Sequence, residues 1–136
     1  AFAGAPFEVI GQSQSAFLPG RTLAENVLLA TEMVHGYNRQ NISPRGMLKV
    51  DMRKAFDSVK WEFIIAALKA LAIPDRFVSW IYQCISTPTF TVSVNGATGG
   101  FFKSSKGLRQ GDPLSPYLFV LAMEVFSKLL YSRYDA

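Results

Sequence analysis

Cysteine and histidine are almost absent from this chain of 136 residues. Cys84 is the only cysteine, which excludes an internal disulfide and a zinc site built from cysteine ligands. His35 is the only histidine, so a metal site with several histidine ligands is excluded as well. A lone thiol suits a reducing compartment, so we expect an intracellular protein, with nothing to decide between nucleus and cytoplasm.

Long apolar runs are missing too. The longest stretch without a charged side chain, residues 77–102, contains one proline, three glycines and many serines and threonines. It therefore does not form an apolar helix of about 20 residues, and we expect no membrane partner. No basic flank precedes an apolar run at the N-terminus, so no secretory signal is indicated. Apolar residues at 49% and charged residues at 18% argue against disorder.

The two ends of the sequence lack the usual marks of a complete protein. The chain begins with Ala1 rather than methionine, and it ends in Tyr134-Asp135-Ala136. Its length fits one domain or part of one. We therefore expect an internal fragment of a longer protein.

The net charge of +4 is unevenly distributed. Residues 39–60 hold six basic side chains against Asp51 and Asp57, and residues 103–109 hold three basic side chains and no acid. Clustered positive charge on a slightly acidic background indicates a polyanionic partner such as nucleic acid or nucleotide phosphates. An ordinary solvated face explains the same charges, and from charge alone it is the favoured interpretation, because basic patches are common on soluble proteins.

Apolar residues recur at three- and four-residue steps in several segments, as in amphipathic helices. Thr22 and Glu25 are spaced as a capping box at the start of the first such segment. Asp57 or Ser58 is expected to cap the second helix, and Asp75 the third. The predicted helices cover approximately residues 22–38, 59–72, 75–85 and 116–131.

Two kinds of strand are indicated. Residues 47–52 are short and apolar, which predicts a buried strand, whereas residues 89–95 alternate between apolar and polar side chains as a half-buried strand does. Asn95-Gly96 signals a tight turn, after which residues 100–104 return as a partner strand. The fold class is therefore mixed α/β, with a small sheet packed by the helices over 59–72 and 116–131.

Asp51 is the first candidate for chemistry. A carboxylate near the end of a buried strand is costly unless it is paired or binds a cation, and Mg²⁺ is a hard ion that suits it. The next residues, Arg53 and Lys54, place positive charge where phosphates would lie. A salt bridge from Asp51 to a neighbouring Lys or Arg is the alternative. For Asp57 we favour helix capping.

Residues 107–116 form the second candidate segment. Its glycines allow close approach of backbone to a ligand, and Arg109 and Gln110 offer donors to phosphate or sugar oxygens. Ser115-Pro116 resembles an N-cap followed by proline at the first helical position, so a plain loop with a helix cap is the alternative. A third segment, residues 12–21, is explained equally well as a helix start with a surface Arg21.

Together these segments resemble a reverse transcriptase. Residues 14–21 (Gln-Ser-Ala-Phe-Leu-Pro-Gly-Arg), 51–57 (Asp-Met-Arg-Lys-Ala-Phe-Asp) and 108–116 (Leu-Arg-Gln-Gly-Asp-Pro-Leu-Ser-Pro) stand in the order and rough spacing of that family. The residues of these motifs are similar to those of the LINE-type, non-LTR retrotransposon branch, and they resemble the plant members of that branch. Group II intron enzymes resemble it less, since theirs reads Gln-Gly-Gly at positions 110–112. Residues 10–136 would be a partial palm and fingers domain.

The resemblance implies nucleotidyl transfer on an RNA template with a DNA primer, a dNTP and two Mg²⁺ ions. In that family the primer 3′-hydroxyl attacks the α-phosphate of the dNTP. Asp51 would bind both ions and the Met52 carbonyl would be a further ligand. Phe56 would be the steric gate against a 2′-hydroxyl. Nucleotide binding would fall to Arg21, Arg53, Lys54, Phe56, Arg109, Gln110 and Gly111.

The chain departs from the family pattern in two places. The family's aromatic-Ala-Asp-Asp motif, which carries the remaining metal carboxylates, does not occur in these 136 residues, and residues 1–9 match no motif. We therefore expect this chain by itself to be inactive. The alternative function is a non-catalytic remnant that at most binds nucleic acid. A hydrolase that uses Asp51 and Asp57 is poorly supported, because no second base or nucleophile accompanies them.

Overall fold

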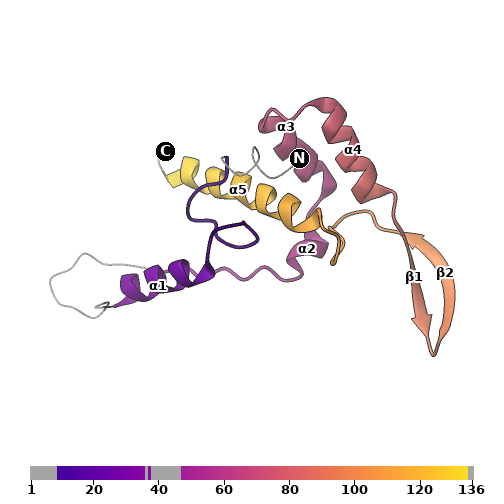
Figure 1. The fold of residues 1–136 in the computed structure, drawn as a ribbon, viewed down its shortest axis with the longest axis horizontal. Coiled ribbons are helices and arrows are strands. Elements are labelled where there is room, and N and C mark those ends of the chain that lie inside the picture. Colours follow the sequence, from indigo (N-terminus) through magenta and orange to yellow (C-terminus); the bar gives the residue numbers. More distant parts are fainter. Residues whose placement is uncertain (1–8, 36, 38–46, 135–136) are drawn as a thin grey trace. The chain divides into compact units, whose positions relative to one another are not determined.

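The computed structural model describes residues 9–35, 37 and 47–134. Seven elements follow in chain order: α1 (Leu23–Val34), α2 (Ala55–Ser58), α3 (Trp61–Ala70), α4 (Asp75–Ser86), β1 (Thr89–Val94), β2 (Ala97–Lys103) and α5 (Ser115–Tyr134) (Figure 1). The chain divides into two compact units, one through Met52 and one from Arg53 onward. Each unit is described by itself. Of the predicted features, most of the unmatched segment 1–9 and the basic residues Arg39 and Arg45 lie outside the described residues.

Helix α1 begins where the sequence predicted but is not capped as predicted. Thr22 takes the N-cap position with extended backbone, yet its side chain makes no capping hydrogen bond, so the predicted capping box does not form. The helix ends at Val34, and His35 follows in extended conformation. None of its residues is buried, and apolar side chains such as Val27 and Met33 are at least 60% exposed. Burial within the first unit therefore does not account for this apolar face.

The predicted buried strand over residues 47–52 is wrong. These residues have no regular secondary structure, and all are exposed, with Leu48 at 88%. A strand needs a hydrogen-bonded neighbour, and in the described part of the chain the only sheet joins β1 to β2. Asp51 consequently lies on an exposed segment rather than at the end of a buried strand.

The second unit has a helical core. Trp61, Ile64 and Leu68 of α3 are buried on the side that faces α4 and α5, as the apolar spacing predicted. Buried side chains of the neighbouring elements complete the cluster: Val78, Ile81, Leu108 and Leu118. Burying a side chain of this size contributes about 1.5–3 kcal/mol, so this cluster is the main source of stability of the unit.

The start of α3 differs from the prediction. Asp57 and Ser58 do not cap it; they lie in the separate single turn α2, and Lys60 occupies the N-cap position of α3. Lys54 has left-handed backbone (φ 51°, ψ 49°) before α2, and Val59 is extended after it. The extended residue breaks the path between the two helices. Asp75 is likewise the first residue of α4 and not its cap, which is Pro74.

Strands β1 and β2 form the predicted hairpin. They pair antiparallel, and Asn95 (φ 51°) and Gly96 (φ 82°) both adopt the positive φ that a two-residue turn requires. Every residue of both strands except Phe90 is exposed, however, so the helices do not cover this sheet. Helices α3 and α5 pack on each other instead, and the hairpin projects away from them (Figure 1). The mixed α/β class is confirmed, while the expected packing of helices on the sheet is wrong.

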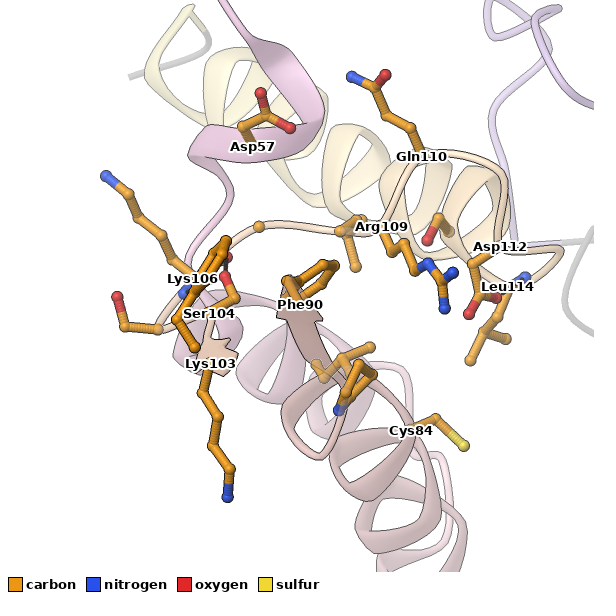
Figure 2. Close-up of a pocket in the computed structure, with 17 residues that line it drawn as sticks. Asp57, Cys84, Phe90, Lys103, Ser104, Lys106, Arg109, Gln110, Asp112 and Leu114 are labelled. Atoms are coloured by element: carbon orange, nitrogen blue, oxygen red, sulfur yellow. Dashed lines mark hydrogen bonds between the residues drawn. The ribbon is translucent and has the colours of Figure 1, made fainter. Parts of the chain in front are cut away.

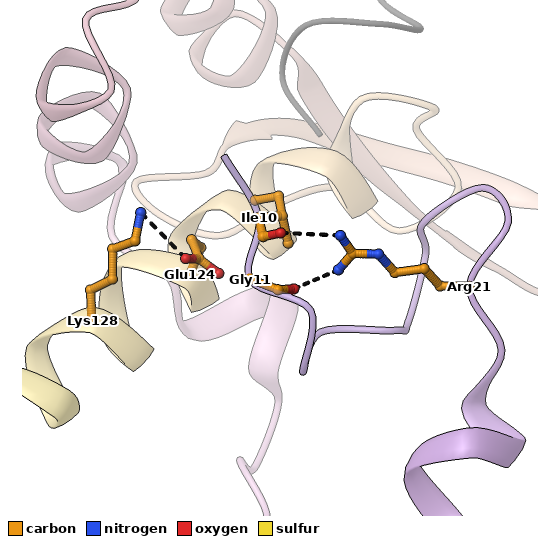
Figure 3. Close-up of polar contacts among 5 residues, drawn as sticks. All are labelled: Ile10, Gly11, Arg21, Glu124 and Lys128. Atoms are coloured by element: carbon orange, nitrogen blue, oxygen red, sulfur yellow. Dashed lines mark hydrogen bonds and ion pairs between the residues drawn. The ribbon is translucent and has the colours of Figure 1, made fainter. Parts of the chain in front are cut away.

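Helix α5 is longer than the sequence predicted and changes character along its length. Leu118 near its start is buried in the core, whereas Leu129, Leu130 and Tyr131 near its end are exposed. Between them Lys128 Nζ lies 3.4 Å from Glu124 Oε1, one turn earlier (Figure 3). Within the described ranges, no helix has both the length and the apolar character needed to cross a membrane.

Candidate functional site

The loop that follows β2 is fixed to the chain around α2. The Leu108 N–H donates to the Phe56 carbonyl at 2.9 Å, and the Gly107 N–H donates to the Val59 carbonyl at 2.8 Å. The Trp61 indole N–H donates to the Gly107 carbonyl at 2.7 Å. These three bonds bring residues 107–111, the first part of the segment 107–116 that the sequence singled out, against the segment that carries Phe56.

Gly107 is required at this contact for two reasons. Its φ of +89° lies in the left-handed region, and a Cβ at this position would stand 2.8 Å from the Asp57 carbonyl oxygen. A side chain would therefore push the loop away from α2. The close backbone approach predicted for the glycines of this segment is thus made at Gly107, toward the protein's own chain.

The ring of Phe56 stacks on a ring of helix α5. Its centroid lies 4.6 Å from that of Phe119, and the two planes differ by 18°. Phe56 is partly buried and packs against the core of the second unit. The side chain that the resemblance implies as a steric gate is therefore a supported ring and not a freely turning one.

A hollow of about 680 Å³ opens between the end of α4, the base of the hairpin and the loop that leads into α5 (Figure 2). Its lining includes Arg109 and Gln110, two of the predicted nucleotide-binding residues. Lys103 and Lys106 line it as well, against the acids Asp57 and Asp112. We call it the basic hollow.

Asp112, which lines this hollow, accepts hydrogen bonds from the turn that leads into α5. Its Oδ1 accepts the Leu114 N–H at 2.8 Å, and its carbonyl accepts the Ser115 N–H at 3.2 Å. Ser115, predicted as the cap, is the buried first residue of α5. The side chain that stabilises the turn into α5 therefore belongs to Asp112.

Arg21 lies in the first unit and binds backbone there. Its Nη1 donates to the carbonyl of Gly11 (2.5 Å) and its Nη2 to that of Ile10 (3.1 Å) (Figure 3). The Nη1 also donates to the Gln14 carbonyl at 2.6 Å. A guanidinium has five N–H donors, of which these contacts use three. Arg21 thus stabilises the segment before α1, and its predicted role at a triphosphate stays a prediction.

The predicted metal ligands also belong to the first unit. Asp51 and Met52 are exposed, and both offer oxygen donors of the kind that Mg²⁺ takes, a carboxylate and a backbone carbonyl. Across the described residues, no three acidic, histidine or cysteine side chains gather around a point. Asp51 and the Met52 carbonyl could therefore supply some of the ligands of a metal site, but not all the ligands that two ions need.

The structure thus brings some predicted residues together. Phe56, Arg109 and Gln110 all lie in the second unit, whose first residues are Arg53 and Lys54. The loop that carries Arg109 and Gln110 is hydrogen-bonded through the Leu108 N–H to the Phe56 carbonyl, whereas the Phe56 side chain does not line the basic hollow. The convergence of Asp51 with Phe56 and Gln110 stays a prediction.

Sequence reasoning missed two aromatic contacts. Phe90 and Phe102 pair across the hairpin at the hollow. Counting outward from the turn would pair Phe90 with Phe101, but the register shifts between Phe90 and Val92 and makes Phe102 the partner. Phe119 carries no sequence signal either, because it is one apolar residue in a helix of many.

The sequence matches the family model described as reverse transcriptase (RNA-dependent DNA polymerase) over residues 3–135. The 149 kDa protein of transposon TX1 from Xenopus laevis is 35% identical over 126 residues, which is 93% of this chain and 10% of that protein. The Pol polyprotein of retrotransposable element R2 from Nasonia vitripennis is 32% identical over 120 residues, 86% of this chain and 11% of the polyprotein. A mitochondrial protein of Arabidopsis thaliana is 64% identical over 36 residues, 26% of this chain and 30% of that protein. The chain spans about a tenth of the length of the first two relatives.

Proposed function

The chain belongs to the reverse transcriptase (RNA-dependent DNA polymerase) family, in the branch of non-LTR retrotransposons, and from this membership we propose that it forms the nucleotide-selecting part of an RNA-directed DNA polymerase. The family acts with divalent metal ions on nucleic acid and nucleotide substrates. The reaction proposed here is transfer of dNMP to the 3′-hydroxyl of a DNA primer, directed by an RNA template.

One observation carries this proposal: the 107–111 loop is hydrogen-bonded to the segment around Phe56. A polymerase that selects deoxynucleotides needs one residue that binds the incoming nucleotide near its sugar and another that excludes a 2′-hydroxyl from the same place. In our proposal Gln110 contacts the nucleotide near its sugar, and the Phe56 ring excludes the 2′-hydroxyl sterically. Arg109 and Gly111 complete the nucleotide-binding loop.

The metal ions are proposed to be two Mg²⁺. Bound at the reacting phosphate, they would steady the attacking and leaving oxygens. Asp51 and the Met52 carbonyl would hold them from this chain, and the exposure of Asp51 leaves its carboxylate accessible. Arg21, Arg53 and Lys54 would lie along the triphosphate, where positive charge offsets the phosphate oxygens.

The basic hollow favours a second candidate function. Three cationic side chains around one concave surface support binding of nucleic acid without catalysis. In that case the chain would act as a binding module whose affinity for RNA depends on salt, with no contribution to bond formation.

A hybrid protein separates the two functions. Residues 10–134 would replace the matching segment of the Nasonia vitripennis R2 polyprotein, which supplies the rest of a polymerase. We expect the hybrid to extend a DNA primer on an RNA template with Mg²⁺ and dNTPs. Asp51→Asn should lower the rate by at least about a hundredfold, because a metal at the reacting oxygen contributes several kcal/mol.

Asp75→Asn is the matched control, since it removes the same charge from the exposed first residue of α4. It should leave primer extension within about twofold of the unsubstituted hybrid, as for surface substitutions in general. A hybrid that shows native circular dichroism and binds RNA but extends no primer would favour the binding module. Extension that survives Asp51→Asn would overturn the metal assignment.

A further inference from the structure

Two aromatic rings line the basic hollow where the hairpin leaves the helices. Phe90 of β1 and Phe102 of β2 are partners across the hairpin, with ring centroids 5.9 Å apart and planes 30° from parallel. Both line the hollow, and Phe102 remains 53% exposed although its ring is stacked on one side. Phe102 therefore presents an aromatic surface to whatever occupies the hollow.

The cations of the hollow are available to a ligand. Among the described residues, Lys103, Lys106 and Arg109 form no ion pair. One of the two acids in the lining, Asp112, already accepts a backbone N–H of the turn into α5. The balance of charge in the hollow is positive, which attracts a polyanion.

Exposed aromatic rings beside unpaired cations are the combination that binds single-stranded nucleic acid. Bases stack on the rings while the cations follow the phosphates. A duplex keeps its bases stacked on each other and has none to offer to Phe102. An acidic peptide would use the cations but has no need of an exposed ring.

The position of the hollow indicates which strand it takes. Gln110, which we assign to the sugar of the incoming nucleotide, lies in the same lining as the two rings and the lysines. The template base that directs incorporation must stand opposite that nucleotide, so the unpaired template has to run close to Gln110.

We propose that the basic hollow binds a single-stranded segment of the RNA template, with a base stacked on Phe102 and phosphates on Lys103 and Lys106. This inference rests on the proposed function for the identity of the strand. It adds a stacking site outside the loop that carries Arg109 and Gln110.

Binding of a 12-nucleotide single-stranded RNA of mixed sequence to the full 136-residue chain, followed by fluorescence anisotropy, tests the stacking site. Phe102→Leu keeps an apolar side chain but removes the ring, and it should weaken binding about 5- to 100-fold. The matched control is Phe101→Leu, since Phe101 is 83% exposed on the same strand and does not line the hollow. It should change the affinity by less than about twofold.

The salt dependence tests the lysines. Replacing both Lys103 and Lys106 with glutamine should reduce the slope of log K against log salt by about 1.4, at about 0.7 for each phosphate contact on a single strand. Lys69→Gln removes a charge from an exposed residue outside the hollow and should leave the slope unchanged. Cys84 also lines the hollow, so bound RNA should slow its alkylation.

The same substitutions in the hybrid protein keep the inference testable if the isolated chain does not fold. Phe102→Leu should there raise the KM for template-primer and leave the KM for dNTP unchanged. Equal effects of Phe102→Leu and Phe101→Leu, or binding of a polyglutamate peptide as tight as that of RNA, would overturn the inference. A hybrid that binds RNA with this pattern but extends no primer would overturn the proposed function alone.

Discussion

The ring of Phe56 lies almost parallel to that of Phe119, with 4.6 Å between the centroids and 18° between the planes. The two residues come from the short turn α2 and from the long helix α5. A side chain that discriminates between sugars by steric exclusion works only if it cannot swing aside. The stack on Phe119 supplies that support, so the selectivity proposed for Phe56 depends on a second residue outside the motif.

Phe56→Val in the hybrid protein should relax sugar selection. The smaller side chain leaves room for a 2′-hydroxyl, while the backbone hydrogen bonds that attach residues 107 and 108 to the chain around α2 do not involve the Phe56 side chain. We expect incorporation of ribonucleotides to rise relative to deoxynucleotides in primer extension with each substrate in turn. Normal activity with unchanged selectivity would count against the gate.

Phe119→Leu should relax the same selection to a smaller extent. Offset aromatic stacking contributes about 0.5–1.5 kcal/mol beyond burial, and its loss lets the Phe56 ring move. Phe119→Tyr keeps the ring and serves as the conservative variant that should restore selectivity. The measurement is the ratio of ribonucleotide to deoxynucleotide kcat/KM; a purely structural role for Phe119 would lower both values and leave their ratio constant.

Gly107→Ala should destabilise the chain more than the same change at other glycines. At Gly107 the new Cβ meets the Asp57 carbonyl oxygen and the φ is positive, so the expected loss is about 1–3 kcal/mol or more in the free energy of unfolding. Gly111→Ala has the positive φ with nothing within 4 Å and should cost less.

Gly99→Ala completes this comparison, because Gly99 has neither a close neighbour nor a positive φ. The order of unfolding free energies measured in urea should therefore be Gly99→Ala highest, Gly111→Ala next and Gly107→Ala lowest. Equal losses at Gly107 and Gly111 would show that the contact with Asp57 adds nothing.

The 136-residue chain by itself should not polymerise DNA. Two metal ions at the reacting phosphate need several negative ligands, and the described residues contain no cluster of three such groups. Primer extension by the purified chain with Mg²⁺, dNTPs and an RNA template should give no product above background. Template-dependent extension that disappears with Asp51→Ala would contradict this expectation.

Local signals in the sequence predicted the elements whose structure depends on neighbours in the chain. The hairpin follows from the alternation before Asn95-Gly96, and the buried face of α3 follows from the spacing of Trp61, Ile64 and Leu68. The strand over 47–52 was wrong because a strand exists only with a partner, and apolar composition does not provide one. The caps assigned to Asp57 and Ser58 were wrong because the extended Val59 separates α2 from α3.

The sequence predicted which residues belong to the candidate site, but it did not predict the contacts that bring them together. The motifs indicated Phe56, Arg109 and Gln110, but nothing in the sequence indicates that Leu108 donates to the Phe56 carbonyl. The stack on Phe119 and the lining of the hollow by Phe102 arise from contacts between distant segments. Such contacts depend on how helices and loops pack, which periodicity does not encode.

The bonds that attach the 107–108 loop to the chain around α2 also have a kinetic consequence. The Trp61 indole and the Gly107 carbonyl are 46 residues apart, so their hydrogen bond closes a long loop. Helices α3 and α4 are neighbours along the chain and need no such closure to meet. The entropy of loop closure must be overcome before distant contacts form. The α3–α4 pair should therefore assemble first, and residues 107 and 108 should bind to the chain around α2 last. The surface proposed to select the nucleotide would then be the final part of this unit to order during folding.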